Sequence, residues 1–232
     1  MSIFKYKAFK SGDKVSKLIV FLHGYNSCIE DVEPFAESLA KDVEGALVVV
    51  PEADMQSERN PSKKQWYALV DVDPDRKRRK PETPTAEIVE IYNKTGLRIS
   101  QAAKKINTFI TSLQHELKVK NKDTFVMGFS QGAMLSMYVG LTRKYELGGV
   151  FPFAGIICGK DMLEKELSSR PEIYLFHGTS DLSVQYKTLD FTKDWLEKHN
   201  IDWEAIEYDG IEHRLIDDEM KDAASIINRR YI

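Results

Sequence analysis

Short, almost continuous apolar runs alternate along the chain with longer segments in which apolar residues recur every three or four positions. The runs predict strands that are buried on both faces, and they cover residues 17–22, 46–50, 123–127, 149–154, 172–176 and 203–208. The periodic segments predict helices, and they cover residues 30–41, 96–117, 133–138, 184–198 and 213–228. We therefore expect an α/β protein with a mostly parallel central sheet and helices on both faces.

The length of 232 residues fits one large α/β domain, and no repeat or linker divides the chain. Residues 3–9 are expected to add an edge strand to the sheet. No apolar run approaches the roughly 20 residues that span a membrane, and the N-terminus carries charges where a signal peptide would be apolar. We expect a single cytoplasmic domain over residues 1–232.

Residues 52–87 do not follow the alternation, because they contain few apolar residues, four prolines and the basic run Arg76–Lys80. A loop of this length in a compact domain is usually functional or disordered. We expect a solvated excursion, that is, a loop that projects into solvent. Several acidic residues flank the basic run and weaken the electric field that it exerts at a distance. The alternative is an anion-attracting patch that gives Arg76–Lys80 a weak peripheral contact with a membrane.

Charge and cysteine content exclude several classes of site. The formal net charge is −3, which does not suggest nucleic-acid binding. Cys28 and Cys158 are far apart and match no metal-ligand spacing, so we expect two reduced thiols and no metal site.

The segment Gly128-Phe129-Ser130-Gln131-Gly132 matches the G-x-S-x-G nucleophile elbow and lies between a predicted strand and a predicted helix. A sharp turn there projects the serine hydroxyl above the sheet, and small residues two positions away let neighbouring backbone pass close. The amide of Gln131, at the start of the helix, is free to bind an anion.

A serine nucleophile needs a histidine base and a carboxylate, which follow in the order Ser, Asp, His in this architecture. Asp181 follows a strand and a glycine turn, although capping of the next helix would also explain it. His213 lies on the last loop, whereas His115 and His199 lie near helix ends and His177 looks structural. Ser130, Asp181 and His213 are the candidate catalytic triad.

The loop after the first core strand reads His23-Gly24-Tyr25 and should approach the elbow from the other side. We expect the Tyr25 amide to join that of Gln131 in an oxyanion hole. A tight turn that uses Gly24 for its conformational freedom is the alternative. Trp66, His23 and Leu182 are the candidate substrate-binding residues, and Trp66 could equally anchor the long loop to the body of the protein.

These segments, together with the 178–184 and 208–213 motifs, resemble the carboxylesterase/phospholipase family of α/β-hydrolases, which includes the acyl-protein thioesterases. The resemblance covers nearly the whole chain. It implies the α/β-hydrolase fold and a serine esterase or thioesterase without a cofactor. Its implied substrates are small-molecule or lipid esters, or acylated proteins.

The chain departs from the family pattern at three places. The family's first loop usually reads H-G-x-G-D, whereas here His23-Gly24 is followed by Tyr25-Asn26-Ser27. Ala133 replaces a second glycine after the elbow, and the run Arg76–Lys80 is not a family hallmark. A peptidase or deacetylase on the same scaffold, and a non-catalytic binding protein of this fold, are the open alternatives. The sequence leaves the acyl group, the leaving group and the oligomeric state open.

Overall fold

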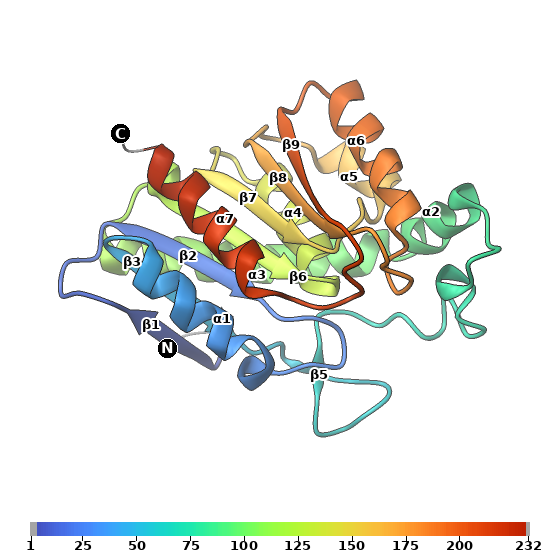
Figure 1. Ribbon diagram of the computed structural model, residues 1–232, viewed down its shortest axis with the longest axis horizontal. Helices are drawn as coiled ribbons and strands as arrows, with labels where there is room; N and C mark the ends of the chain where they lie inside the picture. The colour runs from blue at the N-terminus through green and yellow to red at the C-terminus, as the bar shows by residue number, and fades with distance from the viewer. Residues whose placement is uncertain (1–3, 231–232) are drawn as a thin grey trace.

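The centre of the protein is a seven-stranded sheet with the strand order β1-β3-β2-β6-β7-β8-β9, seen in a computed structural model that describes residues 4–230 (Figure 1). Only β1 is antiparallel to its neighbour, and the other six strands are parallel. The strands are β1 Tyr6–Lys10, β2 Lys17–Leu22, β3 Ala46–Pro51, β6 Thr124–Phe129, β7 Gly149–Phe153, β8 Ile173–Gly178 and β9 Trp203–Tyr208. The mostly parallel sheet was predicted correctly. The predicted edge strand also included Ile3, which lies outside the described residues.

Helices cover both faces of the sheet, as expected from strands that are apolar throughout. They are α1 Ile29–Asp42, α2 Thr85–Asn93, α3 Gly96–Leu117, α4 Gln131–Thr142, α5 Lys160–Glu166, α6 Leu189–Lys198 and α7 Asp217–Arg229. In Figure 1, α1 and α7 lie in front of the sheet and α3 and α4 behind it.

The strand β2 shows how one apolar run serves two cores. Its side chains alternate between the faces of the sheet. Leu18 and Val20 join the apolar cluster of α2–α6, whereas Ile19 and Phe21 join the cluster of α1 and α7. Two apolar layers therefore share one sheet.

Two predicted helices begin later than expected. The segment predicted to be helical from 184 first forms a 3₁₀ turn at Tyr186–Thr188, and α6 follows it. The last helix begins at Asp217 rather than at His213, because the Glu219 carboxylate accepts a hydrogen bond from the Ile216 amide and caps the helix there. His213 consequently lies on a loop. The helices α2 and α5 were not predicted.

The segment 52–87 is folded onto the body of the protein, so the prediction of a solvated excursion is wrong for much of it. It contains the short strands β4 Met55–Gln56 and β5 Lys64–Gln65, which form a hairpin, and a 3₁₀ turn at Lys77–Arg79. Within the basic run, Arg78 is only 4% exposed and forms a buried ion pair with Asp73. The neighbouring residues Arg76 and Lys80 are exposed.

Candidate active site

Ser130 stands at the corner between β6 and α4 with an unusual backbone conformation. Its φ of 55° and ψ of −113° lie in a region that residues with a side chain rarely adopt. The two flanking glycines allow the turn. A Cβ on Gly128 would lie 2.3 Å from the Gly132 carbonyl oxygen, and one on Gly132 would lie 2.2 Å from the Leu22 carbonyl oxygen. The glycines of the motif are therefore required for close packing of backbone.

The structure brings Ser130, His213 and Asp181 together from three loops at the carboxyl edge of the sheet. His213 Nε2 lies 3.0 Å from Ser130 Oγ, and His213 Nδ1 lies 2.7 Å from Asp181 Oδ2. The loops are joined by backbone as well, since the Ser180 amide donates to the Ile211 carbonyl over 3.0 Å. This is the order of contacts that base-activated serine chemistry requires.

Asp181 is buried and held as a carboxylate. Its Oδ1 accepts hydrogen bonds from the Ser183 and Val184 amides over 2.7 and 3.0 Å. Burial alone raises the pKa of Asp181, but hydrogen bonds with His177 and His213 outweigh this and lower it to about 2. These amides belong to a turn that precedes α6, so Asp181 organises its own loop and does not cap that helix.

His177 is a second histidine that contacts Asp181. Its Nε2 lies 2.9 Å from the Val184 carbonyl oxygen, so this nitrogen carries a proton, and it lies 3.4 Å from Asp181 Oδ2. The sequence suggested only a structural histidine at the end of a strand. Its position four residues before Asp181, across a glycine turn, was the available signal for this contact.

The imidazole of His213 also packs on an aromatic ring. The centroids of the His213 and Phe129 rings are 4.7 Å apart, with 34° between the planes. Phe129 is the residue before the nucleophile in the elbow motif. It was not predicted as a functional residue, because the motif leaves that position unspecified.

The loop after β2 lies against the elbow, as expected. A Cβ on Gly24 would lie 3.3 Å from the Phe129 ring and 3.7 Å from Ser130 Cβ. Gln131 is the first residue of α4, where amides have no acceptor within the helix. Its side chain is clamped, because Oε1 accepts from the Trp66 amide over 2.9 Å and Nε2 donates to the Tyr67 carbonyl over 2.7 Å.

His23 is not placed to contact a substrate, so this prediction is corrected. The residue is 0% exposed. Its Nε2 accepts a hydrogen bond from the Ala53 amide over 3.1 Å, and its Nδ1 therefore donates to the Gly24 carbonyl over 2.9 Å. Burial lowers the pKa of His23 to about 4, which keeps the ring neutral. His23 thus fixes the loop after β2.

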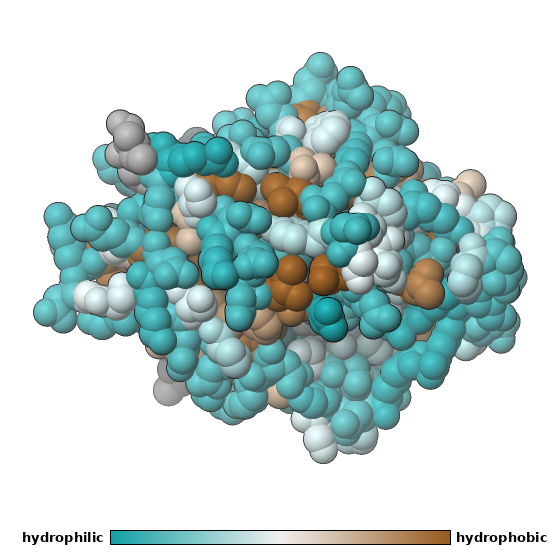
Figure 2. All heavy atoms as spheres, in the orientation of Figure 1, coloured by the Kyte–Doolittle hydropathy of each residue, from teal (hydrophilic) through white to brown (hydrophobic). Residues whose placement is uncertain are grey.

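Trp66 is buried and anchors the long segment, one of the two roles considered for it. Its indole Nε1 donates to the His23 carbonyl over 2.7 Å, and its ring packs on the imidazole of His23. Leu182, beside Asp181, is by contrast 56% exposed. Figure 2 shows apolar surface near the centre of this face, close to where β6 ends and the β9–α7 loop passes in Figure 1.

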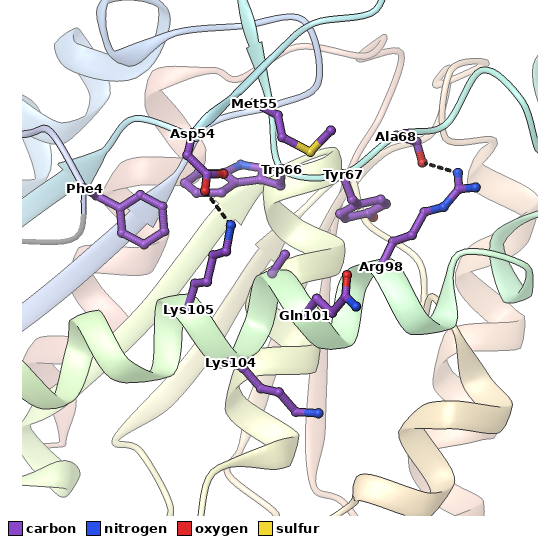
Figure 3. A pocket seen from close by; sticks show the side chains of 11 residues that line it. Phe4, Asp54, Met55, Trp66, Tyr67, Ala68, Arg98, Gln101, Lys104 and Lys105 are labelled. Carbon is purple, nitrogen blue, oxygen red and sulfur yellow. Dashed lines mark hydrogen bonds and ion pairs between the residues drawn. The ribbon is translucent and has the colours of Figure 1, made fainter.

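A separate cavity of about 620 Å³ lies between α3 and residues 54–68 (Figure 3). Its lining includes the Phe4, Trp66 and Tyr67 side chains and contains none of the three triad residues. The backbones of Trp66 and Tyr67 bind the Gln131 side chain, so this wall separates the cavity from the elbow.

Within residues 4–230, no helix is long and apolar enough to cross a membrane. In the same part of the chain, no group of three or more His, Cys, Asp or Glu side chains is arranged to hold a metal ion. Cys28 and Cys158 are both free thiols.

Residues 7–230 match the model of the phospholipase/carboxylesterase family, which covers nearly all of the chain. This protein belongs to the phospholipase/carboxylesterase family. The resemblance that the motifs predicted is thereby confirmed. The family pattern often has a glycine where this chain has Ala133. Gly155 makes room for that side chain, since a Cβ on Gly155 would lie 2.8 Å from Ala133 Cβ.

Curated relatives in the family include acyl-protein thioesterase 1 of Saccharomyces cerevisiae. It is 25% identical over 133 residues, which are 53% of this chain and 58% of that protein. Acyl-protein thioesterase 1 of Mycosarcoma maydis is 23% identical over 95% of this chain and 93% of its own length. The match to the Kluyveromyces lactis protein of the same name covers 60% of that protein. The chain therefore spans only about three fifths of the Saccharomyces cerevisiae and Kluyveromyces lactis relatives.

Solved structures confirm the α/β-hydrolase fold. The esterase PE8 superposes with a TM-score of 0.80 at 24% identity and covers 97% of both chains. SOBER1 of Arabidopsis thaliana superposes with a TM-score of 0.76 at 20% identity, over 93% of this chain and 99% of that one.

Proposed function

We propose that this protein is a serine hydrolase that cleaves carboxylic ester or thioester bonds through an acyl-enzyme intermediate. The observation that carries the proposal is the position of His213, whose two ring nitrogens lie 3.0 Å from Ser130 Oγ and 2.7 Å from Asp181 Oδ2. Membership of a family named for phospholipases and carboxylesterases supports the same chemistry.

In the first step, His213 Nε2 accepts the Ser130 proton while Oγ attacks the carbonyl carbon of the substrate. The tetrahedral intermediate collapses when the imidazolium returns the proton to the leaving alcohol or thiol. Water then attacks the acyl-enzyme with the same histidine as base, and the acid is released. Asp181 stays ionised at neutral pH, because its pKa is lowered to about 2, and it stabilises the imidazolium that forms.

Two main-chain amides are proposed to hold the oxyanion. The Gln131 amide lies at the N-terminus of α4, where the helix dipole favours negative charge. The Tyr25 amide is the proposed second donor, and the packing of Gly24 against Ser130 supports its proximity. Losing one such donor typically costs about 3 kcal/mol of transition-state stabilisation.

The names of the relatives suggest an acylated protein as one substrate, and the family name suggests lipid and small esters as others. Leu182 is the proposed apolar contact for such substrates, since it is exposed beside the triad. A peptidase, a deacetylase and a non-catalytic protein of this fold are outcomes that the following experiment distinguishes.

The test is the hydrolysis of p-nitrophenyl butyrate and of a butyryl thioester by the wild-type protein and by Ser130→Ala. We expect turnover by the wild type and its nearly complete loss in the variant, with unchanged far-UV circular dichroism. A peptide and an acetylated sugar are offered to the wild type in the same assay, and hydrolysis of one of these alone would support the peptidase or the deacetylase instead. Equal turnover in wild type and variant, or none in the wild type, would contradict the proposal.

A further inference from the structure

Two arginines lie beside the loops that form the proposed active site. The guanidinium carbon of Arg59 lies 6.0 Å from the centroid of the Tyr25 ring, in the loop of the proposed oxyanion hole. Arg79 belongs to a turn that is fixed to the triad acid loop. Its neighbours Arg78 and Lys80 both offer their carbonyl oxygens to Gln185 Nε2, over 2.8 and 2.9 Å.

Each arginine is attached to a different loop of the site, Arg59 to that of Tyr25 and Arg79, through the Gln185 contacts of its neighbours, to that of Asp181. Arg59 and Arg79 repel each other electrostatically. These two loops are thus bordered by positive charge.

Five of the eight acidic side chains of residues 52–87 have other partners. Glu58 accepts the Leu69 and Val70 amides. The other pairs are Asp54 with Lys105, Asp71 with Arg98, Asp73 with Arg78 and Glu87 with Lys77. Within residues 4–230, Arg59 and Arg79 form no ion pair with a carboxylate, so their charge is available to a ligand.

The positive charge of Arg79 is poorly stabilised by its surroundings. It is half-buried, and its Nε is enclosed without a hydrogen-bond partner among the described residues. Burial lowers the pKa of Arg79, as do the like charges of Arg78, Arg59 and Arg76, while Tyr92 acts in the opposite direction. A partly desolvated donor among like charges is stabilised by a bound carboxylate or phosphate, whose oxygens match the guanidinium fork.

We propose that Arg59 and Arg79 make this enzyme selective for esters or thioesters that carry a negatively charged substituent near the scissile bond. The inference rests on the proposed function, because it names the substrate class of the same site. The substrates of this class share an anionic oxygen group, which lies on either the acyl part or the leaving group. The basic run is then a source of substrate specificity through Arg79, while Arg78 has a structural role.

The test compares two matched pairs of substrates at low salt. On the acyl side, p-nitrophenyl glutarate monoester is compared with p-nitrophenyl valerate. On the leaving-group side, the butyryl thioester of thioglycolate is compared with that of thioglycolamide. We expect kcat/KM for the anionic member of at least one pair to exceed that of the neutral member by about tenfold or more, and added salt to reduce this ratio.

Variants then assign the preference to the two arginines. Arg59→Gln and Arg79→Gln should each bring the ratio towards one, and Arg59→Lys and Arg79→Lys should retain most of it. Arg229→Gln makes the same change of net charge at the exposed end of α7 and should leave the ratio unchanged. Because Arg59 is exposed, its variants remain informative if those of Arg79 fold poorly.

A ratio near one for both pairs in the wild type, or a ratio that both glutamine variants preserve, would overturn the anionic preference and leave the proposed hydrolase intact. Absence of hydrolysis of all four substrates would instead overturn the proposed function and this inference with it.

Discussion

At the scale of single residues, one local motif and the order of strand ends predicted the site together. Ser130 was selected from the G-x-S-x-G motif, and Asp181 and His213 were selected because each follows a strand in the required order. The structure brings the three residues into contact. His23 follows a strand too, yet it faces the interior. A sequence does not distinguish these cases, since the direction of a loop histidine depends on partners such as the Ala53 amide, which is remote in sequence.

Glu219 is a residue that the sequence did not single out, and it makes stability depend on pH. Its carboxyl is 2% exposed. Burial raises its pKa to about 7, with the Ile216 amide opposing and Asp181 adding to the increase. The folded protein therefore binds a proton more tightly than the unfolded chain does. The stabilisation from this carboxyl is complete below pH 4.5 and is lost as pH rises to and through about 7.

We predict that Glu219→Gln, which keeps a hydrogen-bond acceptor for Ile216, gains stability relative to wild type as pH rises. The difference in the free energy of unfolding between the variant and the wild type should increase by about 2 kcal/mol between pH 5 and pH 8, as measured by urea denaturation at each pH. Glu37→Gln, at an exposed position of α1, should show no such increase. A difference for Glu219→Gln that stays constant with pH would contradict the prediction.

At the scale of elements, the strands were predicted well because burial on both faces leaves an uninterrupted apolar run. Helix starts were predicted less well, since the cap by Glu219 acts through a side chain that lies inside the helix. The segment 52–87 was misjudged for a different reason. Its packing depends on long-range contacts, such as those of Gln131 with Trp66 and Tyr67, which no local pattern reveals.

The elbow glycines give a prediction at this scale. Gly132→Ala would place a methyl group 2.2 Å from the Leu22 carbonyl oxygen and 2.6 Å from that of His23. Backbone cannot move aside cheaply, so we expect a loss of at least about 2 kcal/mol in the free energy of unfolding. Urea denaturation measures it, with Gly12→Ala as the control, because a Cβ on Gly12 meets nothing within 4 Å. Equal stability of both variants would show that the elbow tolerates repacking.

At the scale of the whole molecule, one sheet connects two apolar layers. Side chains of β2 alternate between the layers, so neither layer can lose its packing without disturbing the other. The ion pair of Arg78 with Asp73 and the Gln185 contacts tie the segment 52–87 to the same body. The protein should therefore behave as one cooperative unit, in line with the single domain predicted from its length.

We predict a single calorimetric unfolding transition whose calorimetric and van't Hoff enthalpies agree. Scanning calorimetry at a pH where unfolding is reversible measures both. A separate transition at lower temperature, removed by proteolytic cleavage within residues 52–87, would show that this segment unfolds independently of the sheet.

The central claim is that His213 activates Ser130 for covalent acyl transfer, and the most direct measurement is active-site labelling with a fluorophosphonate followed by peptide mass spectrometry. The account predicts one adduct on Ser130 of the wild-type protein. It also predicts far slower labelling of His213→Ala and none at that position in Ser130→Ala. An adduct on another residue, or labelling of His213→Ala at the wild-type rate, would contradict it.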